Sequence, residues 1–195
     1  MPTGVHLRDV RTQLFDAAER VLLRSGPSAL TSRAVTDEAG CAKGVLHKHF
    51  TDFDGFLTEL VLDRIAHVEA RSDSLAAAAG TAPVIDTVCS ALTDVFSSVA
   101  LSIVALITFR DDLRSRLRAA RPGPGVPLAT DAARMLAHYL TAERTLGHLS
   151  PSADVDTLAA TLVGTGHLLF ADRSGDRDPD TLRPMVASVL SPVLT

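Results

Sequence analysis

The sequence of 195 residues predicts an all-α fold. Apolar residues recur every three or four positions through most of the chain, which is the spacing of one face of an α-helix. The alternation of apolar and polar residues that marks a half-buried strand does not occur between turn signals. Glycine and proline lie mainly between the apolar segments, where they end helices.

The N-terminal segment predicts a long helix followed by a short one. Apolar residues at helical spacing over residues 7–22 predict the long helix, which ends at a Ser-Gly-Pro sequence. The short helix is expected over residues 32–39, because Thr31 or Ser32 can serve as its N-cap and Gly40 can stop it.

A third helix is expected over residues 43–50. It follows the Gly-Cys-Ala turn after the second helix, and Val45, Leu46 and Phe50 form its inward side. Two short helices joined by a glycine-containing turn of three residues form the helix-turn-helix pattern. The same pattern occurs in many proteins that never contact DNA.

The next helix is expected to begin near Asp52 or Asp54, where a carboxylate accepts free backbone N–H groups and complements the helix dipole. Its apolar stripe extends to about Arg71. Residues 72–83 are expected to form a loosely packed connection, within which residues 75–79 have the composition of a helical turn.

The rest of the chain predicts six further helices. Their expected ranges are 84–99, 102–109, 113–120, 128–149, 154–172 and 179–190. Residues 121–127 interrupt this series, because three prolines and two glycines remove backbone donors and loosen the chain. Ser152 or Asp154 can start the helix that follows Pro151.

The composition is that of a folded globular protein, with 46% hydrophobic and 22% charged residues. This balance excludes a collagen-like or disordered chain, and Cys41 and Cys89 are expected as free thiols in a reducing cytoplasm. The N-terminus lacks the apolar stretch of a secretory signal, and the longest apolar run, residues 99–109, is about half of what a bilayer needs. We therefore expect a cytoplasmic protein that does not enter a membrane.

The net charge of −4 conceals an uneven distribution. Residues 1–50 carry seven basic and five acidic side chains, which leaves twelve basic and eighteen acidic side chains for residues 51–195. The two segments therefore differ in charge, +2 against −6. Only the first segment is suited to approach a polyanion.

Residues 31–50 resemble the helix-turn-helix of TetR-family transcriptional regulators. The resemblance is strongest at three short sequences: Ala39-Gly40, Gly44-Val45-Leu46 and His49-Phe50. A long amphipathic helix precedes the segment and another follows, so about the first third of the chain is covered. The resemblance implies a three-helix DNA-binding domain over residues 1–50, a connecting helix over 51–71, and a helical ligand-binding and dimerisation domain over 72–195.

The predicted partner of the N-terminal domain is a double-stranded DNA operator. The third helix can enter a major groove about 12 Å wide and bring its first turns to base edges and phosphates. Hydroxyls and a guanidinium at the start of the second helix suit a phosphate. The predicted contact residues are Thr31, Ser32, Arg33, Lys43, Gly44, Val45, His47, Lys48 and His49. Their charged members can equally form an ordinary solvated face.

Three residues depart from the pattern that the resemblance implies. Ala42 stands in place of a serine, which leaves the third helix without that side-chain N-cap. His47 replaces a tyrosine that touches the DNA backbone, and Phe53 replaces a lysine that contacts a phosphate. We expect weaker or less salt-dependent DNA binding, because each lost phosphate contact lowers the salt slope by about 0.9.

The helical remainder is expected to form a homodimer and to bind an unknown small-molecule effector, as the resemblance implies. Ligand sites are mostly apolar with a few orienting polar groups. The candidate pocket residues are Phe96, Leu101, Val104, Phe109, Met135, His138, Tyr139 and His167. The candidate dimer contacts are Leu158, Leu162, Gly164, Gly166 and Leu169. Each of these residues can instead belong to the core of one chain.

No catalytic motif is present in the sequence, so we expect no enzyme, no cofactor and no metal site. Gly164-Thr-Gly-His lies inside a predicted helix without a preceding strand, so it is not a dinucleotide-binding motif. The leading hypothesis is a ligand-responsive transcriptional repressor released from its operator by a small apolar effector. The alternative is a ligand-binding or protein-interaction dimer whose helix-turn-helix no longer binds an operator.

Overall fold

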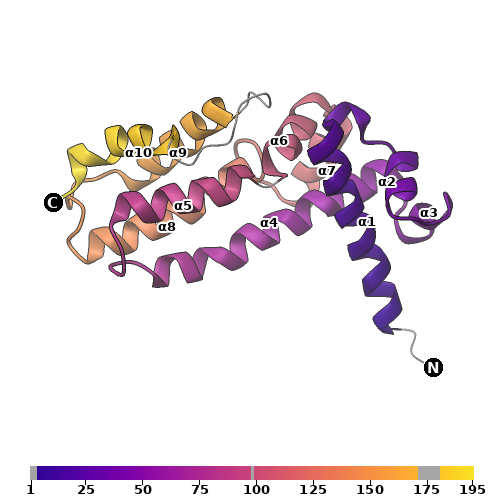
Figure 1. Cartoon of the computed structure of the whole chain (residues 1–195), viewed down its shortest axis with the longest axis horizontal. Coiled ribbons are helices and arrows are strands. Elements are labelled where there is room, and N and C mark those ends of the chain that lie inside the picture. The colour runs from indigo at the N-terminus through magenta and orange to yellow at the C-terminus, as the bar shows by residue number, and fades with distance from the viewer. Residues whose placement is uncertain (1–3, 98, 171–180) are drawn as a thin grey trace. The chain divides into compact units, whose positions relative to one another are not determined.

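The computed structural model describes residues 4–97, 99–170 and 181–195. In these residues the regular elements are helices, with one isolated bridge between Leu149 and Leu194, so the prediction of an all-α fold is confirmed. The helices shown in Figure 1 are α1 (Gly4–Ser25), α2 (Ser32–Glu38), α3 (Val45–His49), α4 (Phe53–Ala77), α5 (Val84–Ser97), α6 (Ala100–Phe109), α7 (Asp111–Ala120), α8 (Ala129–Thr145), α9 (Val155–Phe170) and α10 (Leu182–Leu190), with the short 3-10 helices η1 (Pro27–Ala29) and η3 (Ser191–Val193).

The chain folds into two compact units. The first, which we call the head, runs to Asp63 and includes Ser102–Gly123. The second, which we call the body, comprises Arg64–Leu101 and Pro124–Thr195. α4 and α6 each contribute to both units, and α7 lies in the head. The functional division expected at residues 50 and 71 stays a prediction.

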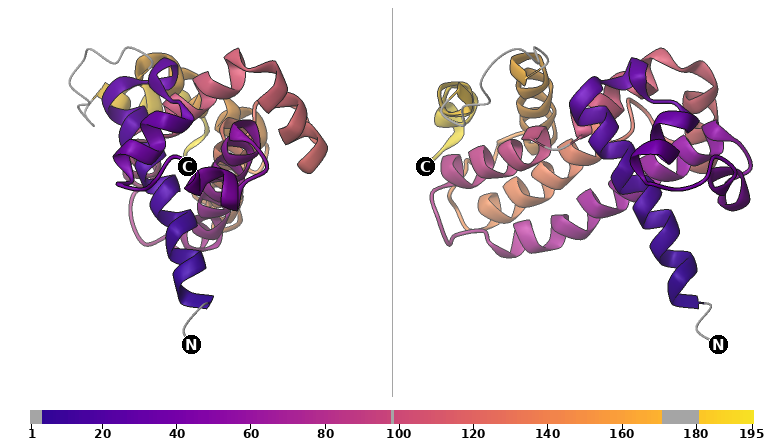
Figure 2. Two further views of the ribbon diagram at one scale, coloured as in Figure 1. Left: turned by 90° about the vertical axis from the view of Figure 1, so that its right-hand side faces the viewer. Right: turned by 45° about the vertical axis from the view of Figure 1, so that its right-hand side comes forward.

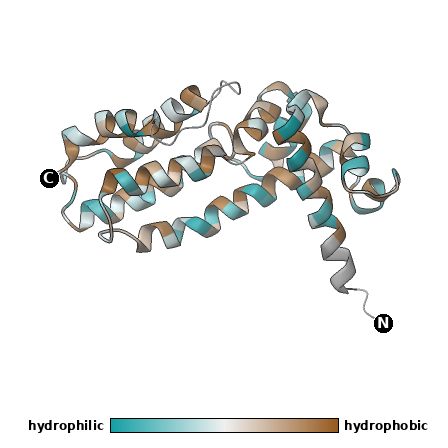
Figure 3. Ribbon diagram, viewed as in Figure 1, coloured by the Kyte–Doolittle hydropathy of each residue, from teal (hydrophilic) through white to brown (hydrophobic). Residues whose placement is uncertain are grey.

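The core of the head includes the apolar face of α1. Leu14, Ala17, Ala18, Val21 and Leu22 are all buried, as their helical spacing predicts. Figure 3 shows hydrophobic and hydrophilic positions alternating along this helix. α1 ends where expected, because Gly26 follows with a φ of 79° that an L side chain rarely adopts.

The start and end of α2 follow the sequence prediction closely. The Thr31 hydroxyl accepts a hydrogen bond from the Ala34 amide at 3.1 Å, so Thr31 is the N-cap. Gly40 has a φ of 66° just after the helix, where a side chain would strain the backbone.

α3 is shorter than the predicted 43–50. Residues 43 and 44 form a turn, in which the Val45 amide donates to the Ala42 carbonyl at 2.9 Å, and the helix begins at Val45. Gly44 is the N-cap residue and offers no side-chain hydrogen bond. The N-cap is therefore Gly44 and not the expected Ala42, and α3 has five residues.

α4 is longer than predicted. It begins at Phe53, where Asp52 Oδ1 accepts from the Gly55 amide at 2.6 Å, and it continues to Ala77 instead of ending near Arg71. The expected loose connection therefore begins several residues later. The chain lacks glycine and proline over 72–79, so the helix meets no stop until Gly80, which has a φ of 76°.

The body is built from α5, α8, α9 and α10 around one hydrophobic core. α9 packs against α8 and α10, and α10 packs against α5 (Figure 2). α8 ends at Thr145, before the predicted 149, because the chain turns at Gly147 with a φ of 84°. Asp154 caps α9, accepting from the Thr157 amide at 3.1 Å. The predicted ends at 172 and 179 lie outside the described residues.

Among the described residues, no single helix combines the length and apolar character required to cross a bilayer, although α5 and α6 taken as a pair meet that requirement.

Candidate DNA-binding surface

The side chains predicted to contact DNA lie mostly on the surface of the head. Thr31, Arg33, Lys43, Gly44, His47 and Lys48 are exposed, whereas Ser32, Val45 and His49 are half-buried. α3 turns Leu46 into the core, with none of its surface exposed. Since Leu46 fixes the inward side of α3, His47 and Lys48 are left on its outer side.

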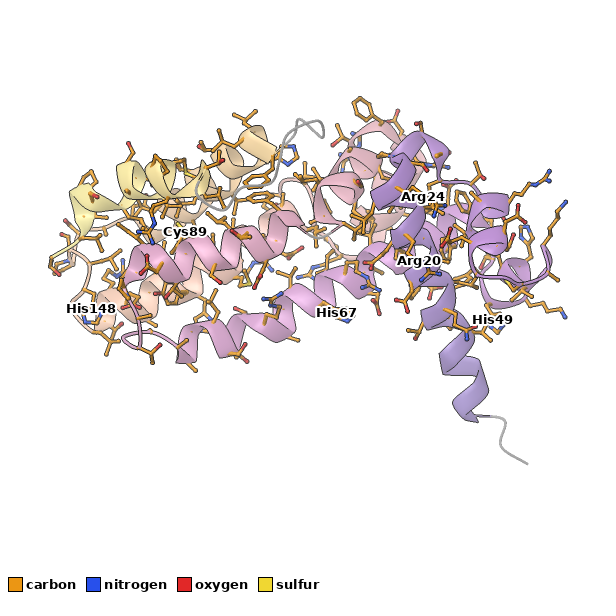
Figure 4. All side chains as sticks on the ribbon, in the orientation of Figure 1. Arg20, Arg24, His49, His67, Cys89 and His148 are labelled. Atoms are coloured by element: carbon orange, nitrogen blue, oxygen red, sulfur yellow. The ribbon has the colours of Figure 1, made fainter. Side chains whose placement is uncertain are left out.

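The exposed basic residues of the head differ in their partners. Arg20 and Arg24 of α1, labelled in Figure 4, both pair with Glu38 of α2 at 2.8 Å. These two guanidiniums lower the pKa of the Glu38 carboxyl. Lys43 and Lys48, by contrast, form no ion pair with any described residue. Their charges are available to a polyanion.

Arg33 and Cys41 lie at the edges of the helix-turn-helix. The Arg33 guanidinium is 3.5 Å from the Asp37 carboxylate one turn later, and both side chains are largely exposed, so the pair is weak. Burial raises the pKa of the Cys41 thiol. A thiol with a raised pKa holds little reactive thiolate at neutral pH.

Phe53 does not stand free at the start of α4. Its ring stacks on Phe56 with centroids 5.8 Å apart, and the Arg110 guanidinium lies 5.7 Å from its centroid. Arg110 also donates to Asp54 at 2.7 Å. The phenylalanine that replaces the expected lysine thus has a packing role within the head.

α7 is joined to the start of α4 by a second arginine. Arg116 donates to both carboxylate oxygens of Asp52, at 2.9 and 2.7 Å. This arginine, followed by the Gly55 amide, holds the pKa of the Asp52 carboxyl below its ordinary value. The pairing joins residues 64 positions apart, so local sequence patterns do not predict it.

The comparisons with known proteins agree with the geometry of the head. Residues 14–60 match the family model described as bacterial regulatory proteins, tetR family. The segment of the head that contains α2 and α3 is therefore similar to the N-terminal part of this family. The match covers α1 from Leu14 onward, α2, α3 and the start of α4, and it includes all nine predicted contact residues.

Several solved structures share the fold of this chain. A TetR-family transcriptional regulator from Mesorhizobium loti aligns with a TM-score of 0.73 at 17% identity over 97% of this chain and 98% of its own. NemR of E. coli in its reduced form gives 0.73 at 17% over 96% and 98%. FadR of Bacillus subtilis, solved with stearoyl-CoA, gives 0.64 at 16% over 92% and 98%. No curated protein sequence matches the chain significantly.

The predicted pocket residues do not form one group. Phe96 and Tyr139 belong to the hydrophobic core of the body, Leu101 packs against it, and Met135 is buried. His138 is exposed, with its Nδ1 3.2 Å from the Ser72 hydroxyl, and His167 is half-buried. Val104 is half-buried and belongs to the head.

Phe109 is the most exposed of the predicted pocket residues that are large and hydrophobic. It also belongs to the head, and 85% of its surface is exposed at the end of α6. An apolar ligand enclosed by protein would need its lining side chains turned away from water. Phe109 does not meet this requirement in the present structure.

The predicted dimer contacts on α9 point in different directions. Leu162 and Gly166 face the core of their own chain: a Cβ added at Gly166 would stand 2.4 Å from Cε2 of Phe96. The close approach made by Gly166 in this structure is to its own chain, and the dimer contacts stay a prediction. Gly164 and Leu169 are exposed and Leu158 is half-buried.

The body contains a buried acidic side chain that the helical pattern of the sequence does not predict. Glu143 of α8 has none of its surface exposed, and it accepts from the Tyr139 hydroxyl at 2.6 Å and the Gly80 amide at 3.0 Å. His148, labelled in Figure 4, lies 2.6 Å from its other carboxylate oxygen. The cluster ties the turn after α4 to the end of α8. In the described residues, no group of three or more His, Cys, Asp or Glu side chains is placed to hold a metal.

Proposed function

We propose that the protein is a homodimeric, ligand-responsive transcriptional regulator that represses by binding a double-stranded DNA operator. The observation that carries the proposal is the exposure, without ion-pair partners, of Lys48 on the outer side of α3 and of Lys43 in the turn before it, within the segment that matches the tetR-family model. A regulator of this kind acts where the DNA is, so we assign it to the cytoplasm.

The proposed contacts divide into two kinds. Lys43, Gly44, His47 and Lys48 enter the major groove with the N-terminal part of α3, where side chains reach base edges. Val45 and His49 line the same side at half-buried positions. Thr31, Ser32 and Arg33 hold the adjacent phosphates, because hydroxyls and guanidiniums suit phosphate oxygens.

A dimer follows from the geometry of DNA. Two recognition helices must lie about 34 Å apart to meet successive major grooves on one face of the duplex. We assign the interface to α8 and the exposed side of α9. That side carries Thr157, Ala160, Thr161, Gly164 and Leu168, and 75% of the Leu168 surface is exposed. Small residues there allow two helices to approach closely.

The proposed effector is a small apolar molecule that binds in the body. The sequence does not identify which molecule it is. The body core consists mainly of aliphatic side chains. The residues that we propose to line the effector site are Phe96, Leu101, Met135, His138, Tyr139 and His167. FadR of Bacillus subtilis, which shares the fold, was solved with stearoyl-CoA. That likeness supports an effector with a long apolar part.

Selection from random DNA duplexes tests the proposal directly. We expect the purified chain to enrich a near-palindromic sequence and to retard it in a mobility-shift experiment. An apolar effector, once found, should release the complex. A chain that enriches no sequence, with or without effector, would instead support the alternative of a dimer whose helix-turn-helix has lost its operator.

A further inference from the structure

The recognition helix of the proposed regulator is too short to hold its own position. α3 has five residues, and isolated helices shorter than about 12 residues are marginal in water. Its N-cap residue, Gly44, supplies no side-chain hydrogen bond, and Leu46 is its one fully buried side chain. Contacts with other elements must therefore fix its orientation.

Arg11 of α1 makes such contacts at the C-terminal end of α3. Its Nη1 donates to the His49 carbonyl at 3.0 Å, and its guanidinium lies 4.4 Å from the centroid of the Phe50 ring. Its Nη2 also pairs with Glu59 of α4. Figure 4 labels His49, which lies near α1 in the head. One guanidinium thus connects α1, α3 and α4.

The chemistry of these contacts is suited to holding the C-terminal end of α3 in place. The last carbonyls of a helix have no partner within it, and they carry the negative end of the helix dipole. A guanidinium donor satisfies one such carbonyl and complements the dipole. The ring below it adds a cation–π attraction, and Glu59 keeps the guanidinium in place.

Phe50 carries the same constraint into the core of the head. Its ring lies 5.8 Å from that of Phe15 and meets Phe56 edge-on at 5.0 Å, and only 4% of its surface is exposed. Phe50 follows directly after α3. The end of α3 is therefore held between an aromatic cluster and the Arg11 guanidinium.

We propose that Arg11 is a positioning residue that sets the orientation of α3, and through it the reach of His47 and Lys48 into DNA. Its guanidinium is engaged by a carbonyl, a ring and a carboxylate, so it acts on DNA through α3 and not as a phosphate contact. The consequence for DNA rests on the proposed function, whereas the consequence for α3 does not.

The first experiment measures amide hydrogen exchange in the free full-length protein. Arg11→Gln should lower the protection of the amides of residues 48–50 by about tenfold, the effect of losing a hydrogen bond to a charged donor. Arg20→Gln is the matched control, since Arg20 is a paired arginine on the same helix without a contact to α3 in the structure. Equal protection in the two variants would overturn the proposal.

Two further variants keep the experiment informative if Arg11→Gln fails to fold. Arg11→Lys keeps the charge but cannot make all three contacts, so protection should fall by less than in Arg11→Gln. Glu59→Gln leaves the guanidinium but removes its carboxylate, and we expect a smaller loss confined to the same amides. Unchanged protection in both would contradict the assigned role.

The second experiment separates positioning from phosphate binding. With a duplex selected by the wild type, Arg11→Gln should weaken specific binding about tenfold or more while leaving non-specific binding and the salt slope unchanged. A slope reduced by about 0.9 would show a direct phosphate contact instead. If the wild type selects no duplex, the proposed function fails, and the exchange measurement still decides the role of Arg11.

Discussion

Glu143 illustrates how a single buried charge is stabilised in the body. Burial alone would raise its pKa, but hydrogen bonds from Tyr139, His148 and the Gly80 amide bring the pKa below its ordinary value of 4.5. Burial also raises the pKa of Tyr139, so its hydroxyl stays protonated and donates to the carboxylate. The ionised form of Glu143 is therefore the one that the fold favours.

Glu143→Gln should destabilise the protein at neutral pH by about 1–3 kcal/mol, because the hydrogen-bond donors around this side chain lose their charged acceptor. The lowered pKa gives the sign of the pH dependence: this stability is complete above pH 4.5 and disappears as the pH falls through the folded-state pKa. Denaturant unfolding from pH 3 to 7 measures it. A difference between wild type and variant that grows on acidification would contradict the account.

Residue-scale contacts were the least predictable from sequence. Arg11, Arg110 and Arg116 each reach partners more than 30 residues away, and nothing local in the sequence indicates which carboxylate or carbonyl each one meets. The exposed basic positions proposed to face DNA could be predicted from the sequence, because helical spacing places them on the side opposite the buried Leu46. Their surroundings were set by tertiary packing.

Two glycines of the helix α9, Gly164 and Gly166, have different surroundings. A Cβ at Gly166 would meet the ring of Phe96, which is itself stacked on Phe170 with centroids 5.6 Å apart. A Cβ at Gly164 would meet nothing within 4 Å. The two positions lie on opposite sides of one helix, one inside the body and one on its surface.

Gly166→Ala should destabilise the body by about 1–3 kcal/mol through overpacking. Within the single chain, Gly164→Ala should instead raise the free energy of unfolding by up to about 1 kcal/mol, because alanine favours the helix more than glycine does. Chemical denaturation of both variants at one protein concentration compares them. Equal effects would mean that Gly166 does not face Phe96 as described.

Helix boundaries were predicted well where a cap or a stop lies in the sequence. Thr31 and Gly40 set α2, and Asp154 starts α9. α4 was predicted too short because polar residues from 72 onward obscured its apolar stripe, although alanine-rich sequence without glycine or proline favours a continued helix. α3 was predicted too long, since a turn over residues 43 and 44 takes the place of its first helical positions.

At the scale of the whole molecule, the proposed dimer can be tested on the exposed side of α9. Ala160→Glu places a charge that a single chain tolerates, but two copies facing each other across a twofold axis would repel. Sedimentation should show monomers, and affinity for the selected duplex should fall. Ser188→Glu, at an exposed position on α10, is the control. A variant Ala160→Glu that stays dimeric would place the interface elsewhere.

The fold class and the nature of the N-terminal domain were predictable because helical spacing and the helix-turn-helix residues are local features of the sequence. The inclusion of α6 and α7 in the head was not, since it depends on Asp52 and Asp54 meeting arginines more than 50 residues away. The small residues of α9 predicted that another helix packs closely against it, but not whether that helix belongs to the same chain or to a partner. Gly166 uses this closeness within its own chain.

The proposed role of α3 and the turn before it is to bind DNA through the unpaired positive charges of Lys48 and Lys43. Its most direct test is the affinity for the selected duplex across a series of salt concentrations, measured by fluorescence anisotropy for the wild type and for the double variant Lys43→Ala, Lys48→Ala. We predict a large loss of affinity and a salt slope smaller by about 0.9 for each lysine that neutralises a phosphate. An unchanged affinity and slope in a folded double variant would contradict the account.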